Sequence, residues 1–226
     1  MTELSGIINV NKPRGLTSHD VVLKIRRLFP GLKVGHGGTL DPQANGVLPI
    51  FVGKATRLTA QVTNQDKEYE GEMILGVNTD THDVDGKILE RRELKDITPE
   101  KLREVFKKFE GEIEQIPPMY SAVRIQGKRL YQLARRGKVV DRPPRKIKIF
   151  WFKLLEINLP YLSFALACSK GTYVRTICSD IGQVLGCGAY LSRLTRIRTG
   201  NYHINQSVGL EELLKSDNPA KYLILA

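Results

Sequence analysis

A glycine-rich loop around a single carboxylate most restricts how this chain can fold. Four glycines lie between positions 35 and 46, and Asp41 stands among them directly before Pro42. Glycine permits left-handed backbone and close approach of another segment, and the proline keeps Asp41 out of helical geometry. The apolar run 47–52 follows at once and can anchor the loop in a core. Residue types alone favour a solvated turn, with a functional loop that presents Asp41 as the alternative.

The overall charge indicates a polyanionic partner. The chain has 226 residues, 41% of them hydrophobic, and a formal net charge of +11 at pH 7. This hydrophobic content supports a packed core, and the charge favours a nucleic acid over its competitor, an acidic membrane surface. No apolar run has the length of a membrane span, and the N-terminal residues lack a signal-peptide pattern. We therefore expect a cytoplasmic protein without a membrane partner.

The cysteines and histidines indicate neither a disulfide framework nor a metal site. The three cysteines, Cys168, Cys178 and Cys187, form no C-x-x-C pair, and the four histidines are scattered. The acid-rich stretch 79–86 contains Asp-x-Asp-Gly but lacks the full calcium-ligand pattern with its final glutamate. We expect reduced thiols and no bound metal.

The positive charge is concentrated in residues 124–148, which we name the basic segment. It holds ten basic residues and one acid, whereas residues 66–114 hold fifteen acids and nine bases. Such an uneven distribution favours phosphate contact over a solvated loop. The candidate RNA-binding residues of the basic segment are Arg124, Lys128, Arg129, Arg135, Arg136 and Lys138.

Apolar periodicity and turn signals predict a mixture of strands and helices. Strands are expected over residues 6–11, 67–76, 147–155 and 161–168, the last two as a pair. Helices are expected to begin at the caps Ser18, Thr98 and Thr172, near Gly53, and as a short turn over 131–137. Arg175 falls in the first turn of the helix after Thr172, where a cation opposes the helix dipole, so a functional partner would justify its placement.

Residues 35–48 resemble the catalytic motif of the TruB family of pseudouridine synthases. The string Gly-His-Gly-Gly-Thr-Leu-Asp-Pro is followed, after Gln43, by Ala-x-Gly-Val-Leu, and the match to the motif has no gap. The aspartate of that motif is the family's catalytic residue, so the resemblance implies this role for Asp41. His36 would then help to hold the opened arm of the RNA. Gly37 departs from the threonine usual in the family, which removes a hydroxyl beside the loop.

Two further stretches resemble motifs of the same family. Residues 11–20 resemble its N-terminal motif, in which Lys12 would support the active site. By residue type, Lys12 is equally a phosphate ligand or a solvated turn lysine. Lys67-x-Tyr69 resembles the second motif, whose tyrosine packs against the target base. A strand tyrosine is usually a core residue, so this role for Tyr69 depends on the resemblance.

The remaining motifs of the family are matched further along the chain. Residues 79–86 and 168–177 imply that Asp83 pairs with the active-site arginine, Arg175, which would sit beside the catalytic aspartate. Residues 189–196 resemble the last motif and imply that Leu191 supports the active site. Lys170, within 168–177, is a further candidate for RNA binding.

The resemblance extends from about residue 6 to about residue 214 and implies a fold and an activity. The expected fold is α/β (α+β): a mixed, largely antiparallel sheet with flanking helices and a central RNA-binding cleft. We expect one catalytic domain over 1–226, with the basic segment as an insertion and without a C-terminal PUA domain. The expected activity is isomerisation of uridine 55 in the T arm of tRNA, by a monomer and without a cofactor. The alternatives are an RNA chaperone or binding module and the catalytic subunit of a guide-RNA particle.

Overall fold

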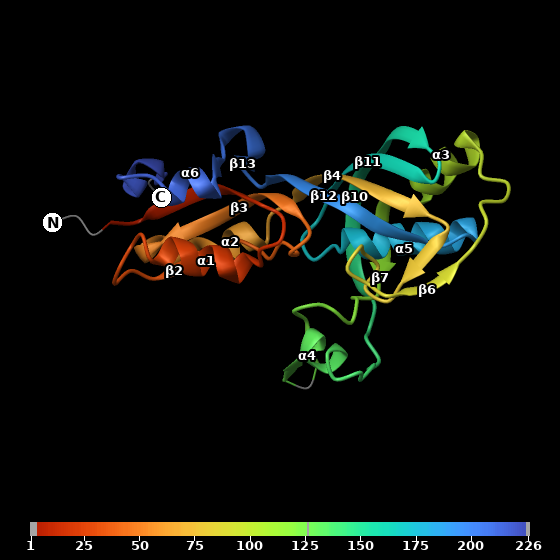
Figure 1. Cartoon of the computed structure of the whole chain (residues 1–226), viewed down its shortest axis with the longest axis horizontal. Coiled ribbons are helices and arrows are strands. Elements are labelled where there is room, and N and C mark those ends of the chain that lie inside the picture. Colours follow the sequence, from red (N-terminus) through yellow and green to blue (C-terminus); the bar gives the residue numbers. More distant parts are fainter. Residues whose placement is uncertain (1–3, 126, 225–226) are drawn as a thin grey trace. The chain divides into compact units, whose positions relative to one another are not determined.

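The structure is a computed structural model, and it describes residues 4–125 and 127–224. The chain divides into two compact units, which are described separately (Figure 1). The first unit is formed by the chain up to Glu70 and from Leu194 onward, and the second by Gly71–Arg193. None of the helices in the described residues is long and apolar enough to cross a membrane.

The first unit is built on a small mixed sheet. Its strands are β1 (Gly6–Lys12), β2 (Val34–His36), β3 (Asn45–Val52), β13 (Tyr202–His203), β14 (Val208–Gly209) and the end of β12 (Ala189–Thr199). Strand β1 runs antiparallel to β3 and parallel to β14, while β12 runs parallel to β3. All of β3 after Asn45 is buried, as the unbroken apolar run 47–52 predicts.

Helices cover both faces of this sheet. On one face α1 (Ser18–Arg26) and α6 (Leu210–Leu214) pack against β1 and β3 through residues such as Val21, Leu213 and Ile50. On the other face η1 (Gly53–Leu58) and α2 (Thr59–Thr63) enclose Phe51. The unit also contains the short 3-10 helices η2 (Ile204–Gln206) and η3 (Pro219–Tyr222).

The second unit holds a sheet, antiparallel over its last three strands, with helices packed against it. Its hydrogen-bonded order is β4 (Lys67–Leu75), β11 (Tyr161–Cys168), β10 (Arg145–Asn158) and β7 (Gly111–Gln115). Helices α3 (Pro99–Lys108) and α5 (Val174–Leu185) lie over it, and Phe106 of α3 meets Phe152 of β10 with ring centroids 4.5 Å apart. Two hairpins stand outside this sheet: β5 (Val77–Thr79) with β6 (Ile88–Arg91), and β8 (Arg124–Ile125) with β9 (Lys128–Arg129). The second hairpin leads into α4 (Leu130–Ala134), drawn in green in Figure 1.

The predicted fold class and the predicted strands are confirmed, whereas two predicted helix caps are wrong. Thr17, not Ser18, caps α1 and forms a capping box with Asp20. Tyr173, not Thr172, is the N-cap residue of α5. In each case the hydroxyl has another acceptor: Ser18 bonds to Leu40, and Thr172 donates to a carbonyl before the helix.

Candidate active site

Asp41 lies in the first unit, on the loop that joins β2 to β3, and its side chain is half-buried. Leu40, directly before it, is buried at 3% exposure. The Ser18 hydroxyl accepts from the Leu40 N–H at 2.8 Å and donates to the Leu40 carbonyl at 3.0 Å. The residue that precedes the candidate catalytic acid is therefore tied to the start of α1.

Lys12 holds the residue that follows Asp41. Its side chain is fully buried, and Nζ donates to the carbonyls of Pro13 at 2.9 Å, Leu16 at 2.8 Å and Pro42 at 3.3 Å. The alternative of a solvated turn lysine is therefore wrong, because the ammonium is buried and directed at backbone carbonyls. Burial lowers the pKa of Lys12 to about 8; the nearby Asp41 carboxylate opposes that change and Arg196 adds to it.

Arg196, on β12, is a third contact to the loop and was assigned no role from the sequence. The residue is 1% exposed. Its Nε donates to the Val47 carbonyl at 2.7 Å, Nη1 to that of Thr39 at 3.1 Å and Nη2 to that of Gly38 at 3.2 Å. The sequence does contain a signal for its burial. Arg196 follows the apolar Leu194 by two positions, and residues two apart on a strand lie on the same face.

One glycine of the loop is required by this contact. Gly46 has φ 107°, and a Cβ there would lie 2.3 Å from the Arg196 carbonyl oxygen. Gly46 and Arg196 are partners in the parallel pairing of β3 with β12. The close approach that glycine permits therefore brings the arginine strand against the loop.

Tyr69 and His36 are the other predicted site residues in the first unit. Tyr69 lies on β4 at 8% exposure, on the same strand face as the buried Lys67. His36 ends β2 and is half-buried. Burial, and then the Arg196 cation, lower the pKa of His36 below its usual range. Its imidazole is therefore neutral near pH 7, with one donor and one acceptor nitrogen.

The second unit contains the predicted ion pair between Asp83 and Arg175. Arg175 Nη1 lies 3.1 Å from Asp83 Oδ2, with side-chain exposures of 6% and 13%. Arg175 Nη2 donates to the Tyr120 carbonyl at 2.6 Å. The other oxygen of Asp83 accepts from the Thr81 hydroxyl and the Asp85 N–H. The ion pair implied by the resemblance is thus present, and its arginine, Arg175, lies in the first turn of α5.

Leu191 joins the same cluster through its backbone. Its N–H donates to the His82 carbonyl at 3.0 Å, and it forms an isolated parallel bridge with Asp83. His82 has φ 64°, a left-handed turn conformation, and burial followed by the Arg175 cation lowers its pKa. The structure therefore brings together three of the predicted site residues, Asp83, Arg175 and Leu191.

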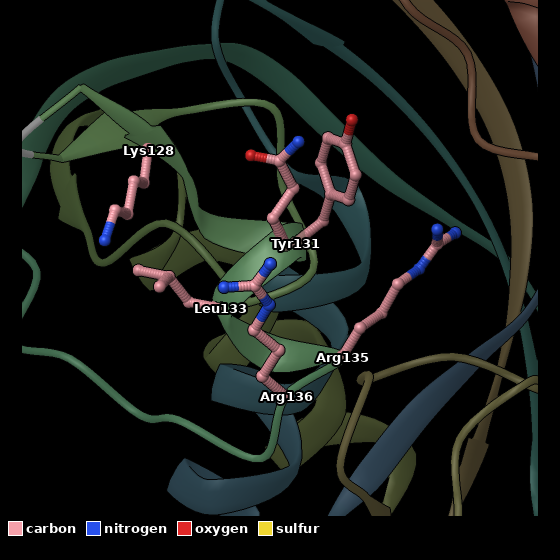
Figure 2. A pocket seen from close by; sticks show the side chains of 6 residues that line it. Lys128, Tyr131, Leu133, Arg135 and Arg136 are labelled. Carbon is pink, nitrogen blue, oxygen red and sulfur yellow. The ribbon is translucent and has the colours of Figure 1, made fainter.

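The six candidate RNA-binding residues of the basic segment are all exposed. The guanidinium groups of Arg129 and Arg135 lie over the Tyr131 ring, 5.9 and 5.4 Å from its centroid, as cation–π contacts. Figure 2 shows the hollow beside α4, with Lys128 and Arg135 extending to different sides of the helix. This open hollow measures about 520 Å³ and is lined by Lys128, Tyr131, Gln132, Leu133, Arg135 and Arg136. Lys170, after β11, is also exposed.

Sequence comparisons assign the chain to a family. Residues 26–174 match the family model described as "TruB family pseudouridylate synthase (N terminal domain)". The chain belongs to the TruB family. Residues 175–223 match a second model, "tRNA pseudouridylate synthase B C-terminal domain".

Bacterial relatives match almost the whole length of this TruB-family chain. A protein of Clostridium kluyveri named tRNA pseudouridine synthase B is 48% identical in an alignment of 225 positions, which covers 98% of this chain and 76% of that protein. Proteins of the same name from Clostridium tetani and Dehalococcoides mccartyi are 47% and 46% identical, over 99% and 96% of this chain and 77% and 73% of their own lengths.

Solved structures of similar proteins support the same fold. One is that of a Cbf5-Nop10-Gar1 complex, in which the matched chain is 32% identical with a TM-score of 0.76. The match covers 97% of this chain but only 60% of that chain. A second is an archaeal box H/ACA sRNP Nop10-Cbf5 complex, with 32% identity and a TM-score of 0.70 over 97% of this chain and 58% of the other.

Proposed function

We propose that this chain isomerises uridine to pseudouridine in tRNA, and that its target is the uridine at position 55 in the T arm. The observation that carries the proposal is the Asp41 loop, which presents one half-buried carboxylate on a fixed backbone in a chain of the TruB family. Bacterial relatives that are 45–48% identical to this chain are named tRNA pseudouridine synthase B. Their name supports tRNA as the substrate.

The reaction rearranges bonds within one nucleotide. The bond from C1′ of the ribose to N1 of uracil breaks, the base turns, and a bond from C1′ to C5 forms. C5 loses its proton to solvent and N1 takes up one proton. Atoms and electrons balance without an oxidant or a cofactor, and over the described residues no cluster of three or more His, Cys, Asp or Glu side chains could hold a metal ion.

We assign Asp41 the catalytic role. An ionised carboxylate can attack as a nucleophile or stabilise positive charge that develops on the sugar. The target uridine must leave its stack to reach any such group, and the Tyr69 ring offers an aromatic face for the extruded base. The resemblance assigns Arg175, Asp83, Leu191 and Lys12 to the support of this reaction. Within the second unit Asp83 holds the buried Arg175 by an ion pair, and within the first unit the buried Lys12 holds the Asp41 loop.

The basic segment supplies the proposed RNA contacts. Its six exposed arginines and lysines, together with Lys170 and His36, would contact the phosphates and the opened T arm. We propose that the protein acts as a monomer in the cytoplasm, which agrees with three buried cysteines that are free thiols.

A guide-RNA-dependent subunit is the second candidate. The similar solved chains include Cbf5 in its complex with Nop10 and Gar1 and an H/ACA RNP with a substrate RNA containing 2′-deoxyuridine. The higher identity to the bacterial tRNA enzymes, 48% against 32%, favours an enzyme that acts alone. A non-catalytic RNA-binding module would bind tRNA without turnover.

Tritium release from an unmodified tRNA transcript labelled at C5 of uridine tests the proposal. The purified protein alone should release tritium, and a transcript with cytidine in place of the T-arm uridine should not. Release that requires an added guide RNA would support the second candidate. Asp41→Asn should abolish release while tRNA affinity stays within about threefold, because phosphate contacts supply most of the affinity. Turnover by Asp41→Asn near the wild-type rate would remove Asp41 from the catalytic role.

A further inference from the structure

We propose that Arg196 is a positioning residue for Asp41, a role that rests on the proposed catalytic function of that carboxylate. The three carbonyls that accept from Arg196 belong to Gly38, Thr39 and Val47. Two of them precede Asp41 in the chain and the third follows it. One planar guanidinium therefore joins the two ends of the loop segment that carries the acid.

The geometry requires an arginine rather than any buried cation. Three separate nitrogens of the guanidinium each donate to a different carbonyl, at 2.7, 3.1 and 3.2 Å. The fork fixes the angles between these donors, so it sets the separation of the two loop ends. A lysine ammonium is a point charge on a flexible stem and would keep the charge without holding that separation.

The depth of the contact makes the arrangement rigid. At 1% exposure Arg196 has little access to water, and its bond to the Val47 carbonyl is buried, so loss of the donor would leave that carbonyl buried without this partner. The backbone of Arg196 also pairs with Gly46, where no Cβ fits. Neighbouring Thr195 donates its hydroxyl to the Asn45 side chain at 3.0 Å. The strand and the end of the loop are therefore held by side chain and backbone together.

Arg196 completes a set of three buried contacts around Asp41. Ser18 binds Leu40 on one side of the acid, and Lys12 binds Pro42 on the other. These two act on the immediate neighbours of Asp41, whereas Arg196 acts at the base of the loop. Displacement of a reacting group by about 1 Å can cost roughly 10²-fold in rate. Loosening the two loop ends that Arg196 joins should therefore lower kcat.

Arg196→Lys and Arg193→Lys form a matched pair for the test. Both residues lie on β12, but the Arg193 side chain is 75% exposed. Arg196→Lys should lower kcat for tritium release by about 10²-fold and leave KM within about threefold, because the basic segment that binds RNA is unchanged. Arg193→Lys should keep both constants near the wild-type values. A kcat for Arg196→Lys within threefold of wild type, or a change in KM alone, would overturn the inference.

Chemical rescue separates positioning from a general loss of structure. Arg196→Ala leaves a guanidinium-sized space, so millimolar guanidinium should raise its kcat at least tenfold, whereas ammonium at the same ionic strength should not. Failure of guanidinium to rescue a folded Arg196→Ala protein would count against the inference. If Arg196→Ala does not fold, Arg196→Lys decides alone.

Hydrogen exchange keeps this inference distinct from the proposed function. Amides of the loop donate to defined acceptors: Gly37 to the Pro49 carbonyl, Leu40 to the Ser18 hydroxyl and Ala44 to the Asp41 carbonyl. They should exchange faster in Arg196→Lys than in wild type, with the second unit unchanged. If wild-type protein forms no pseudouridine, the proposed function fails. The exchange result then still decides whether Arg196 holds the loop, and unchanged exchange would refute that.

Discussion

Replacement of Asp83 by asparagine should destabilise the second unit strongly, because it removes the carboxylate charge that pairs with a buried arginine. Asp83→Asn preserves the shape of the side chain but removes the charge that faces Arg175 at 3.1 Å. Arginine cannot lose its proton in a protein, so the guanidinium remains charged. Its remaining contacts include the Tyr120 carbonyl and the face of the Tyr173 ring, 5.8 Å from its centroid.

The expected cost follows from the burial of the pair. Removing one partner of a buried ion pair costs about 3–5 kcal/mol. Asp83 keeps 13% of its side chain exposed, so we expect the lower end, about 3 kcal/mol, or roughly a hundredfold change in the folding equilibrium constant. The double variant Asp83→Asn/Arg175→Met should be more stable than Asp83→Asn alone, because the buried cation is removed together with the charge that Asp83 supplied.

Urea unfolding followed by tryptophan fluorescence measures this cost directly. The chain has a single tryptophan, Trp151, and it lies on β10 of the second unit. Glu104→Gln is the matched control, because it breaks the i,i+4 pair with Lys108, whose side chains are 60–66% exposed, and should cost about 0.5 kcal/mol or less. An Asp83→Asn midpoint as close to wild type as that of the control would refute the reasoning. So would a double variant less stable than Asp83→Asn.

Three further predictions concern other parts of the site. Tyr69→Phe should keep kcat within about threefold of wild type in the tritium assay, because a stacked ring does not need its hydroxyl; a loss beyond tenfold would assign that hydroxyl a chemical role. Replacing Arg135, Arg136 and Lys138 together by glutamine should flatten the dependence of log Kd on log salt by about 0.7–0.9 for each phosphate that these side chains neutralise, and an unchanged slope in filter binding would indicate a solvated loop. Because the pKa of Lys12 is lowered from 10.5 to about 8, the unfolded chain binds more protons than the folded chain between these values. The free energy of unfolding should therefore rise with pH there, by up to about 1.4 kcal/mol per unit relative to Lys12→Met, and urea titrations across that range would contradict this if the difference stayed flat.

The spacing of apolar residues along the chain predicted several strands correctly. The partial alternation over 67–76 predicted β4, and the strand pair predicted over 147–155 and 161–168 is present as β10 and β11. The run 47–52, expected to anchor the loop in a core, is a fully buried part of β3. The caps at Ser18 and Thr172 were wrong because a cap depends on which acceptor lies nearest in three dimensions. Ser18 meets Leu40, 22 residues away, and local sequence does not contain that contact.

The candidate site also contains residues that the sequence named and residues whose roles depend on contacts distant in the chain. The resemblance to the TruB motifs named Asp41 and the Asp83–Arg175 pair, and the structure contains that pair. Residue type left Lys12 open between phosphate binding and solvent, since one of its acceptors, Pro42, lies 30 residues along the chain. Arg196 was matched only as part of the last motif and was assigned no role, because its three acceptors lie about 150 residues away in the chain. Its spacing of two residues from Leu194 was the better guide, because the face of a strand on which a residue lies determines its burial more strongly than its residue type.

The departure at Gly37 shows how packing can replace a polar group. A threonine hydroxyl at this position would stand beside the loop, yet a Cβ here would lie 3.0 Å from both the Phe51 ring and Val62. These two neighbours are 0% and 5% exposed, so they have little room to move away. The Gly37 N–H still donates to the Pro49 carbonyl at 2.8 Å, which closes the loop without any side chain. With the base of the loop held by Arg196 and the neighbours of Asp41 held by Ser18 and Lys12, a hydroxyl at position 37 is not needed to order it. The glycine is instead the residue that lets β2 approach the Phe51 side of the core.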